Sequence, residues 1–322
     1  MTVSVVIPAY NAASFLAETI ASAVAQTYAA HEIIVVDDGS TDATVAVAEA
    51  CGARVIRQEN RGVCAARNTG ILAATGAWIA LLDHDDLWTK GKLERQMAAA
   101  TLRPDVACIA TDFLRLRGGE LDPVSCLEDT TYDVSKLTTV TIATDTLYFP
   151  RAGEDVMETG WFLFPSSMLI RRDVLIATGM FRPEQRLCED VDCFLRVLHR
   201  TPLILIVDPL WYWREHATNT SQNSRGIAEG WLRMAEYVGT TPGDYPPGTL
   251  NRIQPILRTV RRGLVNAYTS DGDFRSARRV ARSAIGGPLT PTDAALAVVV
   301  ELPPKVWGAL RRAKRALRSF FS

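Results

Sequence analysis

Residues 33–40 read Ile33-Ile34-Val35-Val36-Asp37-Asp38-Gly39-Ser40, a continuous apolar run that ends in two acids and a turn. A run that is apolar at consecutive positions is typical of a strand buried on both faces of a parallel sheet. Similar runs alternate with stretches of helical periodicity through the first hundred residues. This alternation predicts an open α/β sheet, mostly parallel and sandwiched by helices. The expected strands are 3–8, 32–37, 54–57 and 78–83, and the expected helices are 13–26, 42–51 and 62–74.

Composition is that of an ordinary folded protein and excludes several classes. Of the 322 residues, 48% are hydrophobic and 22% are charged, which rules out a disordered or collagen-like chain. The six cysteines include no C-x-x-C pair, so we expect reduced, buried thiols and neither zinc nor disulfides. No basic segment precedes the first apolar run, and residues 294–300 are far shorter than the ~20 residues of a membrane span. These features predict a cytoplasmic protein.

The later part of the chain changes character twice. Residues 115–160 are irregular and rich in Thr, Asp and Pro, which we interpret as a surface excursion and a candidate acceptor-binding loop. Strand and helix patterns return at 166–170, 190–199, 203–207 and 210–216, and only helical patterns follow residue 222. We therefore predict three parts, namely residues 1–222, a helical domain at 223–302 and a final helix at 303–322. The helices expected after residue 222 are 228–237, 250–269, 274–285, 291–302 and 305–321.

Acids gather where two predicted strands end. Asp37 ends the strand at 32–37, while Asp83 ends the strand at 78–83 and Asp85 and Asp86 follow it. Ligands of open α/β sheets bind at the carboxyl ends of the strands, so these acids mark the expected site. Carboxylates in this number are the oxygen ligands that Mg²⁺ or Mn²⁺ takes beside a diphosphate. The alternative is a solvated loop in which Asp85 caps the next helix.

Charge is unevenly distributed along the chain. The last twenty-one residues hold six basic residues and no acid, which leaves 29 basic and 36 acidic residues in the body. A mildly acidic body argues against nucleic acid as the main partner. Residues 303–322 form a basic amphipathic pattern with Trp307, Phe320 and Phe321, which favours binding to an anionic membrane surface. The alternatives are a helix docked on its own protein or one that pairs two subunits.

Six motifs follow one another in order along the first two thirds of the chain. They are Ser4-Val5-Val6-Ile7-Pro8-Ala9-Tyr10-Asn11, Val36-Asp37-Asp38-Gly39-Ser40-Thr41-Asp42, Asn60-Arg61-Gly62-Val63 with Ala66-Arg67-Asn68-Thr69-Gly70, Leu82-Asp83-His84-Asp85-Asp86-Leu87-Trp88, Cys188-Glu189-Asp190-Val191-Asp192, and Tyr212-Trp213-Arg214-Glu215-His216. Together they resemble the family-two inverting glycosyltransferases with the A-type glycosyltransferase fold, which is Rossmann-like. The resemblance covers residues 2–222, and it implies a metal-dependent enzyme whose donor is a nucleoside diphosphate sugar.

Residues of the first three motifs correspond to the donor site of the family. The resemblance implies that Pro8, Tyr10 and Asp38 hold the base and ribose, with Asp37 in support. An acid can accept hydrogen bonds from ribose hydroxyls or a base N–H, so Asp38 suits that role. Arg67 corresponds to a basic contact with the nucleotide, and a surface salt bridge is its alternative.

The fourth and last motifs correspond to the metal site. The resemblance implies that Asp86 is the direct ligand of Mg²⁺ or Mn²⁺ and that Asp85 contacts the ribose or the metal, with Asp83 in support. His84 departs from the small residues common at its position. His216 corresponds to the histidine near the metal and diphosphate, although a structural histidine is the alternative.

Asp190 corresponds to the general base of the family, with Glu189 in support. An inverting transfer needs one carboxylate to take the proton of the acceptor hydroxyl. A helix N-terminus lowers the pKa of an aspartate, whereas neighbouring Glu189 and Asp192 raise it, and the sequence does not decide between them. The alternative is that Glu189 and Asp190 only begin a helix.

These observations predict the addition of a single sugar, from a UDP-sugar, to a hydroxyl of a saccharide or lipid-linked saccharide in envelope polysaccharide or glycolipid synthesis. Gly226 stands where processive synthases of the family carry Trp, which argues against processive synthesis. Such an enzyme is expected in the cytoplasm or at the inner face of the membrane. One alternative is a nucleotidyltransferase, but residues 9–13 lack a Gly-rich phosphate loop with a basic residue. The other is a non-catalytic nucleotide-sugar-binding or scaffold protein, which has less need of Asp86 and Asp190.

Overall fold

A computed structural model describes residues 1–129, 137–158 and 161–282, together with residues 298 and 301. The chain divides into two compact units. The first comprises residues 1–222 and the short segment 242–247, and the second comprises residues 223–241 and the chain from residue 248 onward. The chain therefore passes between the units three times.

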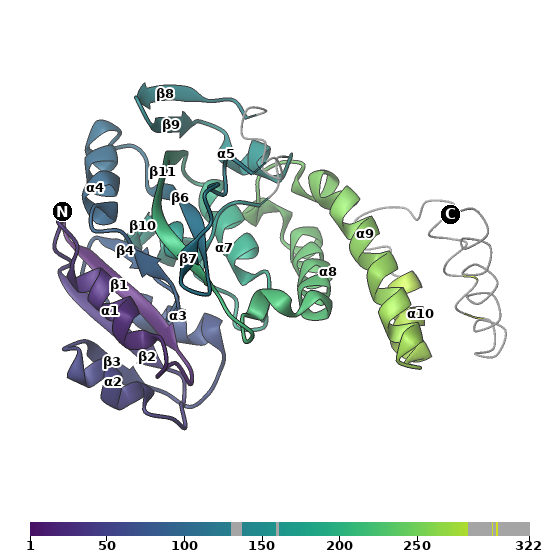
Figure 1. The fold of residues 1–322 in the computed structure, drawn as a ribbon. Coiled ribbons are helices and arrows are strands. Elements are labelled where there is room, and N and C mark those ends of the chain that lie inside the picture. The colour runs from purple at the N-terminus through teal and green to yellow at the C-terminus, as the bar shows by residue number, and fades with distance from the viewer. Residues whose placement is uncertain (130–136, 159–160, 283–297, 299–300, 302–322) are drawn as a thin grey trace. The chain divides into compact units, whose positions relative to one another are not determined.

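Four parallel strands form the first half of the central sheet, in the order β3-β2-β1-β4 (Figure 1). Strand β1 pairs with β2 from Ser4 opposite Glu32 to Ala9 opposite Asp37. All seven residues of β1 are buried, which explains why its sequence is apolar without alternation. The elements of this half are β1 (Val3–Ala9), α1 (Leu16–Val24), β2 (Glu32–Asp37), α2 (Thr44–Ala50), β3 (Arg54–Arg57), α3 (Val63–Ala73) and β4 (Trp78–Leu81).

The sheet continues past β4 with mixed strand directions, in the order β4-β10-β6-β11-β9-β8. Strand β10 is antiparallel to both β4 and β6, while β11 is parallel to β6. Short strands β5 and β7 pair with β11 and β6. The elements are β5 (Leu87–Trp88), α4 (Lys92–Leu102), β6 (Cys108–Arg117), β7 (Glu120–Leu121), β8 (Val140–Ala143), β9 (Thr146–Phe149), α5 (Ala152–Asp155), β10 (Leu169–Arg171), α6 (Arg172–Ala177), α7 (Glu189–Leu198) and β11 (Leu203–Glu215).

The predicted fold class is confirmed, because helices flank a central sheet whose first four strands are parallel (Figure 1). Two local predictions are wrong. Residues 115–160 are not only a surface excursion, since they hold the end of β6 and the antiparallel hairpin β8-β9 at the sheet edge. The strands predicted at 203–207 and 210–216 form one strand, β11, whose register with β6 shifts around Pro209. Proline has no N–H for the ladder, which accounts for the shift.

Helix α3 lies unusually close to the sheet at Gly70. A Cβ atom at this position would lie 2.4 Å from Cγ1 of Val6 and 3.2 Å from Cγ2 of Val36. Only glycine fits such a contact without movement of β1 or β2. The helix begins after Gly62, which has a φ of +88°. Gly70 therefore fixes the distance between α3 and the strands that carry the first two motifs.

The described part of the second unit is helical, with α8 (Ser224–Thr240), α9 (Thr249–Ser270) and α10 (Phe274–Arg282). Asn223 caps α8 by accepting a hydrogen bond from the N–H of Gly226 at 2.9 Å, and Asp273 accepts one from the N–H of Ser276 at 3.0 Å. The helices predicted at 228–237 and 250–269 are present and longer than expected, and the helix predicted at 274–285 is present through Arg282. The helix predicted at 303–322 lies outside the described residues, and so does the one predicted at 291–302 apart from residues 298 and 301.

Two expectations drawn from composition, on the cysteines and on membrane spans, can be compared with the described residues. All six cysteines are free, and four of them are buried. Among the residues that the structure describes, no helix has the length and apolarity needed to cross a bilayer.

Candidate active site

Three loops follow neighbouring strands at one edge of the sheet. Tyr10 follows β1, Asp38 follows β2, and the acids Asp83, Asp85 and Asp86 follow β4. Strand β1 is hydrogen-bonded to β2 on one side and to β4 on the other, and all three are parallel. The carboxyl ends of parallel strands meet at the same edge, so the predicted donor and metal residues share it.

The loop after β1 is fastened to the loop after β2. Asn11 has a positive φ of 49°, and its N–H donates a hydrogen bond to Oγ of Ser40 at 2.9 Å. Pro8 is buried within β1, whereas Tyr10 is 47% exposed. An exposed aromatic ring on a fixed loop can stack on a flat ligand. The sequence analysis missed Asn11, whose signal was that asparagine tolerates positive φ better than most residues.

Asp37 and Asp38 are buried, and Asp38 is fully engaged with the protein. It accepts hydrogen bonds from the backbone N–H of Arg61 at 2.9 Å and of Gly62 at 2.8 Å. It also accepts one from Nε2 of Gln58 at 2.6 Å. Asp38 therefore holds residues 58–62 in place ahead of α3, which the sequence did not predict.

Asp86 is the most deeply buried of the three acids after β4. Its Oδ2 accepts a hydrogen bond from the Ser166 hydroxyl at 2.5 Å, and its Oδ1 accepts one from the N–H of Arg214 at 3.2 Å. Burial raises the pKa of Asp86 well above its usual range, and the charges of Asp85 and Asp83 raise it further. The three acids therefore repel one another, and a cation beside them would relieve this repulsion.

His216, the residue directly after β11, contacts the acids that follow β4. Its Nε2 lies 2.9 Å from Oδ2 of Asp85, and its ring stacks on Phe15 with the centroids 4.7 Å apart. Arg214 reinforces this junction, because its Nε donates a hydrogen bond to the carbonyl oxygen of Asp85 at 2.9 Å. The structure thus brings the two predicted residues Asp85 and His216 together.

The predicted ligands Asp85, Asp86 and His216 do not form a three-ligand group. Within the described ranges, no cluster of three or more His, Cys, Asp or Glu side chains is placed to hold a metal ion. Both oxygens of Asp86 already accept hydrogen bonds, while Asp85 and His216 form a pair. Mg²⁺ is commonly held by one or two protein groups together with substrate phosphates. The acids therefore fit a divalent cation that a diphosphate helps to bind.

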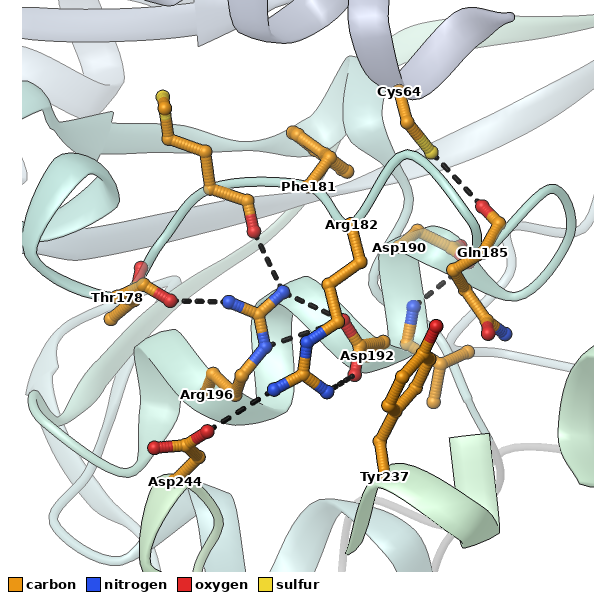
Figure 2. A network of polar contacts seen from close by, with 12 residues as sticks. Cys64, Thr178, Phe181, Arg182, Gln185, Asp190, Asp192, Arg196, Tyr237 and Asp244 are labelled. Atoms are coloured by element: carbon orange, nitrogen blue, oxygen red, sulfur yellow. Dashed lines mark hydrogen bonds and ion pairs between the residues drawn. The ribbon is translucent and has the colours of Figure 1, made fainter. Parts of the chain in front are cut away.

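Helix α7 begins with three acids, two of which are paired with arginines. Oε1 of Glu189 accepts a hydrogen bond from Nη1 of Arg67 at 2.8 Å, and Oδ2 of Asp192 accepts one from Nη2 of Arg196 at 2.6 Å. Figure 2 shows the guanidinium of Arg196 against Asp192, with Asp190 apart from it. Among the residues described, Asp190 forms no ion pair with a lysine or arginine. It is the one acid of this turn without a bound countercharge.

Asp190 has a pKa suited to proton transfer near neutral pH. Burial and then the charge of Glu189 raise the pKa of Asp190 to about 7, although a hydrogen bond from the N–H of Val191 at 2.8 Å and the charge of Arg67 lower it. The pKa is therefore raised mainly by burial, which the sequence did not reveal, and Glu189 raises it as expected. A base of this pKa is half ionised at neutral pH and accepts a proton readily.

Arg67 links the two acidic regions. Its guanidinium donates through Nη1 to Glu189 and through Nη2 to Oδ1 of Asp83, both at 2.8 Å. The Arg67 side chain is only 4% exposed and lies over the ring of Phe181 at 5.1 Å. The predicted alternative, an ion pair, is therefore present, but it is buried and not at the surface.

The sequence analysis also missed the residues that support these acids. Ser166 and Arg214 bind Asp86, and Arg182 and Tyr245 bind Asp192. Arg214 lies in a quoted motif without a role assigned to it, whereas Ser166, Arg182 and Tyr245 lie in no motif, and all four meet the acids only through the fold. Polar side chains with such remote partners give no local signal.

Comparisons with known proteins agree with this arrangement. The family described as "Glycosyl transferase family 2" matches residues 4–177. The uncharacterized glycosyltransferase RT0329 of Rickettsia typhi is 44% identical over 97 residues, which cover 30% of each chain. The UDP-Glc:alpha-D-GlcNAc-diphosphoundecaprenol beta-1,3-glucosyltransferase WfgD of Escherichia coli is 41% identical over 100 residues, which cover 30% of this chain and 40% of that one. The putative teichuronic acid biosynthesis glycosyltransferase TuaG of Bacillus subtilis is 41% identical over 101 residues, with the same coverage. The matches thus span less than half the length of these relatives.

Solved structures extend the likeness over nearly the whole chain. S. aureus TarS 1-349 in complex with UDP has a TM-score of 0.54 and 20% identity, with 97% of this chain and 92% of that chain covered. The complex of TarS 1-349 with UDP-GlcNAc has a TM-score of 0.58 and 18% identity over the same shares. At this level of identity the likeness shows the fold.

Proposed function

The chain belongs to glycosyl transferase family 2, and on this premise we propose that it moves one sugar from a nucleoside diphosphate sugar to a hydroxyl group, with inversion at the anomeric carbon. The transferase activity follows from the family. The alternatives of a nucleotidyltransferase and of a non-catalytic protein are set aside on the same ground.

The isolation of Asp190 carries this proposal. Its neighbours Glu189 and Asp192 are each neutralised by an arginine, whereas Asp190 keeps a pKa near 7, raised by burial and by Glu189. In the proposed step, Asp190 takes the proton of the acceptor hydroxyl while that oxygen attacks the anomeric carbon. The bond to the nucleoside diphosphate breaks on the opposite side. One base and one displacement produce inversion.

Negative charge develops on the diphosphate as it leaves, and a bound cation would stabilise that charge. We propose that Asp85 holds Mg²⁺ or Mn²⁺ through Oδ1, which accepts no hydrogen bond among the described residues, and that His216 orients this carboxylate, because Asp85 and Thr218 engage both of its ring nitrogens. Asp86 was expected as the direct ligand, but its contacts with Ser166 and Arg214 favour a role in fixing the loop and adding negative charge.

The nucleotide is proposed to lie along the edge that Tyr10 and Asp38 form. The exposed ring of Tyr10, which follows the buried strand β1, suits stacking on a base, and Asp38 shapes the loop after β2. Asp85 is within the same edge and is available to a ribose hydroxyl or to the cation. The solved complexes of TarS 1-349 with UDP and with UDP-GlcNAc support a uridine donor. Arg67 was expected to contact the nucleotide, but we propose that it contributes positive charge through its ion pair with Asp83.

The acceptor is proposed to be a lipid-linked saccharide of an envelope polysaccharide. The names of two relatives support this class, one with a diphosphoundecaprenol-linked acceptor and one from teichuronic acid biosynthesis. Such an acceptor is presented at the cytoplasmic face of the membrane. The basic residues within 303–322 would hold the protein at that anionic surface.

The variant Asp190→Asn tests the proposal. It removes the base and keeps the shape of the side chain, so transfer from a UDP-sugar should fall by at least a thousandfold while UDP binding stays within about twofold. Asp173→Asn is the matched control, since Asp173 lies in the first turn of α6 and its side chain is 62% exposed. Full turnover by Asp190→Asn would refute the assignment of the base.

A further inference from the structure

We propose that the segment 242–247 positions the catalytic base, because Tyr245 and Asp244 hold the first turn of α7 through a buried cluster centred on Asp192. This inference rests on the proposed role of Asp190. The segment interrupts the helical region between α8 and α9, yet it belongs to the first unit. It also lies outside residues 4–177, which the family description covers.

The cluster surrounds a carboxylate that is completely buried. Oδ2 of Asp192 accepts hydrogen bonds from Nη2 of Arg196 at 2.6 Å and from its Nε at 3.2 Å. Oδ1 of Asp192 accepts one from Nη1 of Arg182 at 3.2 Å and one from the hydroxyl of Tyr245. Figure 2 shows the guanidinium groups of Arg182 and Arg196 meeting at Asp192. Hydrogen bonds to a buried carboxylate are strong and costly to lose.

The segment supplies two members of the cluster. The Tyr245 side chain is 1% exposed, and its oxygen accepts a hydrogen bond from Nη1 of Arg182 at 2.6 Å. Oδ2 of Asp244 pairs with Nη2 of Arg182 at 3.1 Å, which fixes the other arm of the same guanidinium. The segment is also closely seated, because a Cβ on Gly153 of α5 would lie 2.7 Å from Cγ of Pro246.

Side-chain contacts hold the start of α7 on both sides of Asp190, with the pair of Glu189 and Arg67 before it and the Asp192 cluster after it. The residue before the helix, Cys188, has a left-handed conformation and provides no side-chain cap. Three acids in the first turn repel one another, although the helix dipole favours each of them. Asp192 is two residues beyond Asp190, so a movement of Asp192 carries the base with it. A base displaced by about 1 Å loses much of its effect.

The variant Tyr245→Phe tests the inference in the full-length protein. It removes one hydroxyl and leaves the ring in its buried place. We expect turnover at saturating substrate to fall about tenfold with UDP binding unchanged, and amide exchange in residues 186–195 to become faster. Asp244→Asn, at a 46% exposed side chain, should change both quantities in the same direction by about threefold.

Tyr268→Phe is the matched control, because the Tyr268 hydroxyl also donates to a carboxylate, that of Glu229 in the second unit. Its turnover and its exchange in residues 186–195 should equal those of the wild type. Exchange in that segment that is the same for Tyr245→Phe as for the wild type would overturn the inference, whatever the enzyme transfers. Faster exchange with undiminished turnover would overturn it too. If the wild-type protein transfers no sugar, the proposed function fails, and the exchange measurement still decides whether Tyr245 fixes the turn.

Discussion

Nε2 of His216 lies 2.9 Å from Oδ2 of Asp85, although 131 residues separate them in the chain. The contact closes the edge of the sheet, because His216 follows β11 and Asp85 follows β4. Arg214 repeats the same link through the carbonyl oxygen of Asp85. Two independent bonds therefore place a histidine and a carboxylate side by side where the diphosphate is proposed to bind.

Removal of this pair should abolish the metal dependence of nucleotide binding. In Asp85→Asn or His216→Gln, we expect the stimulation of UDP binding by Mn²⁺ to fall at least tenfold, because the cation loses either its carboxylate ligand or the histidine that orients that ligand. Titration calorimetry with and without Mn²⁺ measures this directly. Asp105→Asn, at an exposed aspartate, is the control. If Asp86→Asn abolishes the Mn²⁺ effect while Asp85→Asn keeps it, Asp86 is the ligand after all.

Turnover should depend on pH through Asp190. Burial and the charge of Glu189 raise the pKa of Asp190 to about 7, and only the ionised carboxylate accepts a proton. The value of kcat/KM should therefore fall about tenfold for each pH unit below 7 and level off above it. The profile is measured with a UDP-sugar between pH 5 and 9. A profile that is flat from pH 5 to 7 would contradict the assignment.

The same raised pKa makes a prediction about stability. The unfolded chain ionises this group near 3.8, whereas the folded protein holds its proton up to about pH 7. The group therefore destabilises the fold increasingly as pH rises from about 4 to 7. Asp190→Asn should melt at a higher temperature than the wild type at pH 8, and the difference should vanish near pH 4. An unchanged melting temperature at pH 8 would contradict this.

Loss of Arg67 should harm both stability and catalysis. The variant Arg67→Met leaves Glu189 and Asp83 without their shared cation, and breaking a buried ion pair costs about 3 to 5 kcal/mol of unfolding free energy. The charge of Glu189 would then raise the pKa of Asp190 further. Denaturant unfolding measures the first effect. The control Arg54→Met breaks a half-exposed pair with Glu32 and should cost less than about 1 kcal/mol.

Two helical glycines should respond in opposite ways to alanine. Gly70→Ala forces a Cβ within 2.4 Å of Val6 and should lower the unfolding free energy by about 1 to 3 kcal/mol. Gly263→Ala, inside α9, meets no atom within 4 Å and should raise it by about 1 kcal/mol, because alanine favours a helix. Equal effects in thermal melts would show that the close contact of α3 with β1 tolerates movement.

The first four strands and the loops at their carboxyl ends could be predicted from the sequence because their signals are local. Strands β1 and β4 are buried throughout, β2 is buried over its last four residues, and the acid clusters stand at the ends of β2 and β4. The helix that starts at Glu189 also has a clear periodicity. The meeting of Asp85 with His216 needed a family resemblance, since no local pattern relates residues so far apart.

The rest of the site depends on partners that local patterns do not reveal. The short strand β9 pairs with β11 more than fifty residues away, and its own four residues carry too little signal. Asp86 has the sequence context of a metal ligand, but Ser166 and Arg214 occupy its oxygens. Arg67 lies in a motif associated with the nucleotide, yet two buried acids attract its guanidinium. In each case the contacts of a residue come from parts of the chain that are distant in sequence.

Strand β6 carries a consequence for synthesis on the ribosome. Its first six residues are buried between β10 and β11, both of which are made later, at 169–171 and 203–215. The short strand β7 pairs only with its last two residues. During translation, about fifty more residues are therefore synthesised after β6 before β10 can pair with it. Until then β6 is an unpaired apolar strand, and such strands promote aggregation. Chaperone dependence of this protein should begin with β6 and end only when β11 has left the exit tunnel.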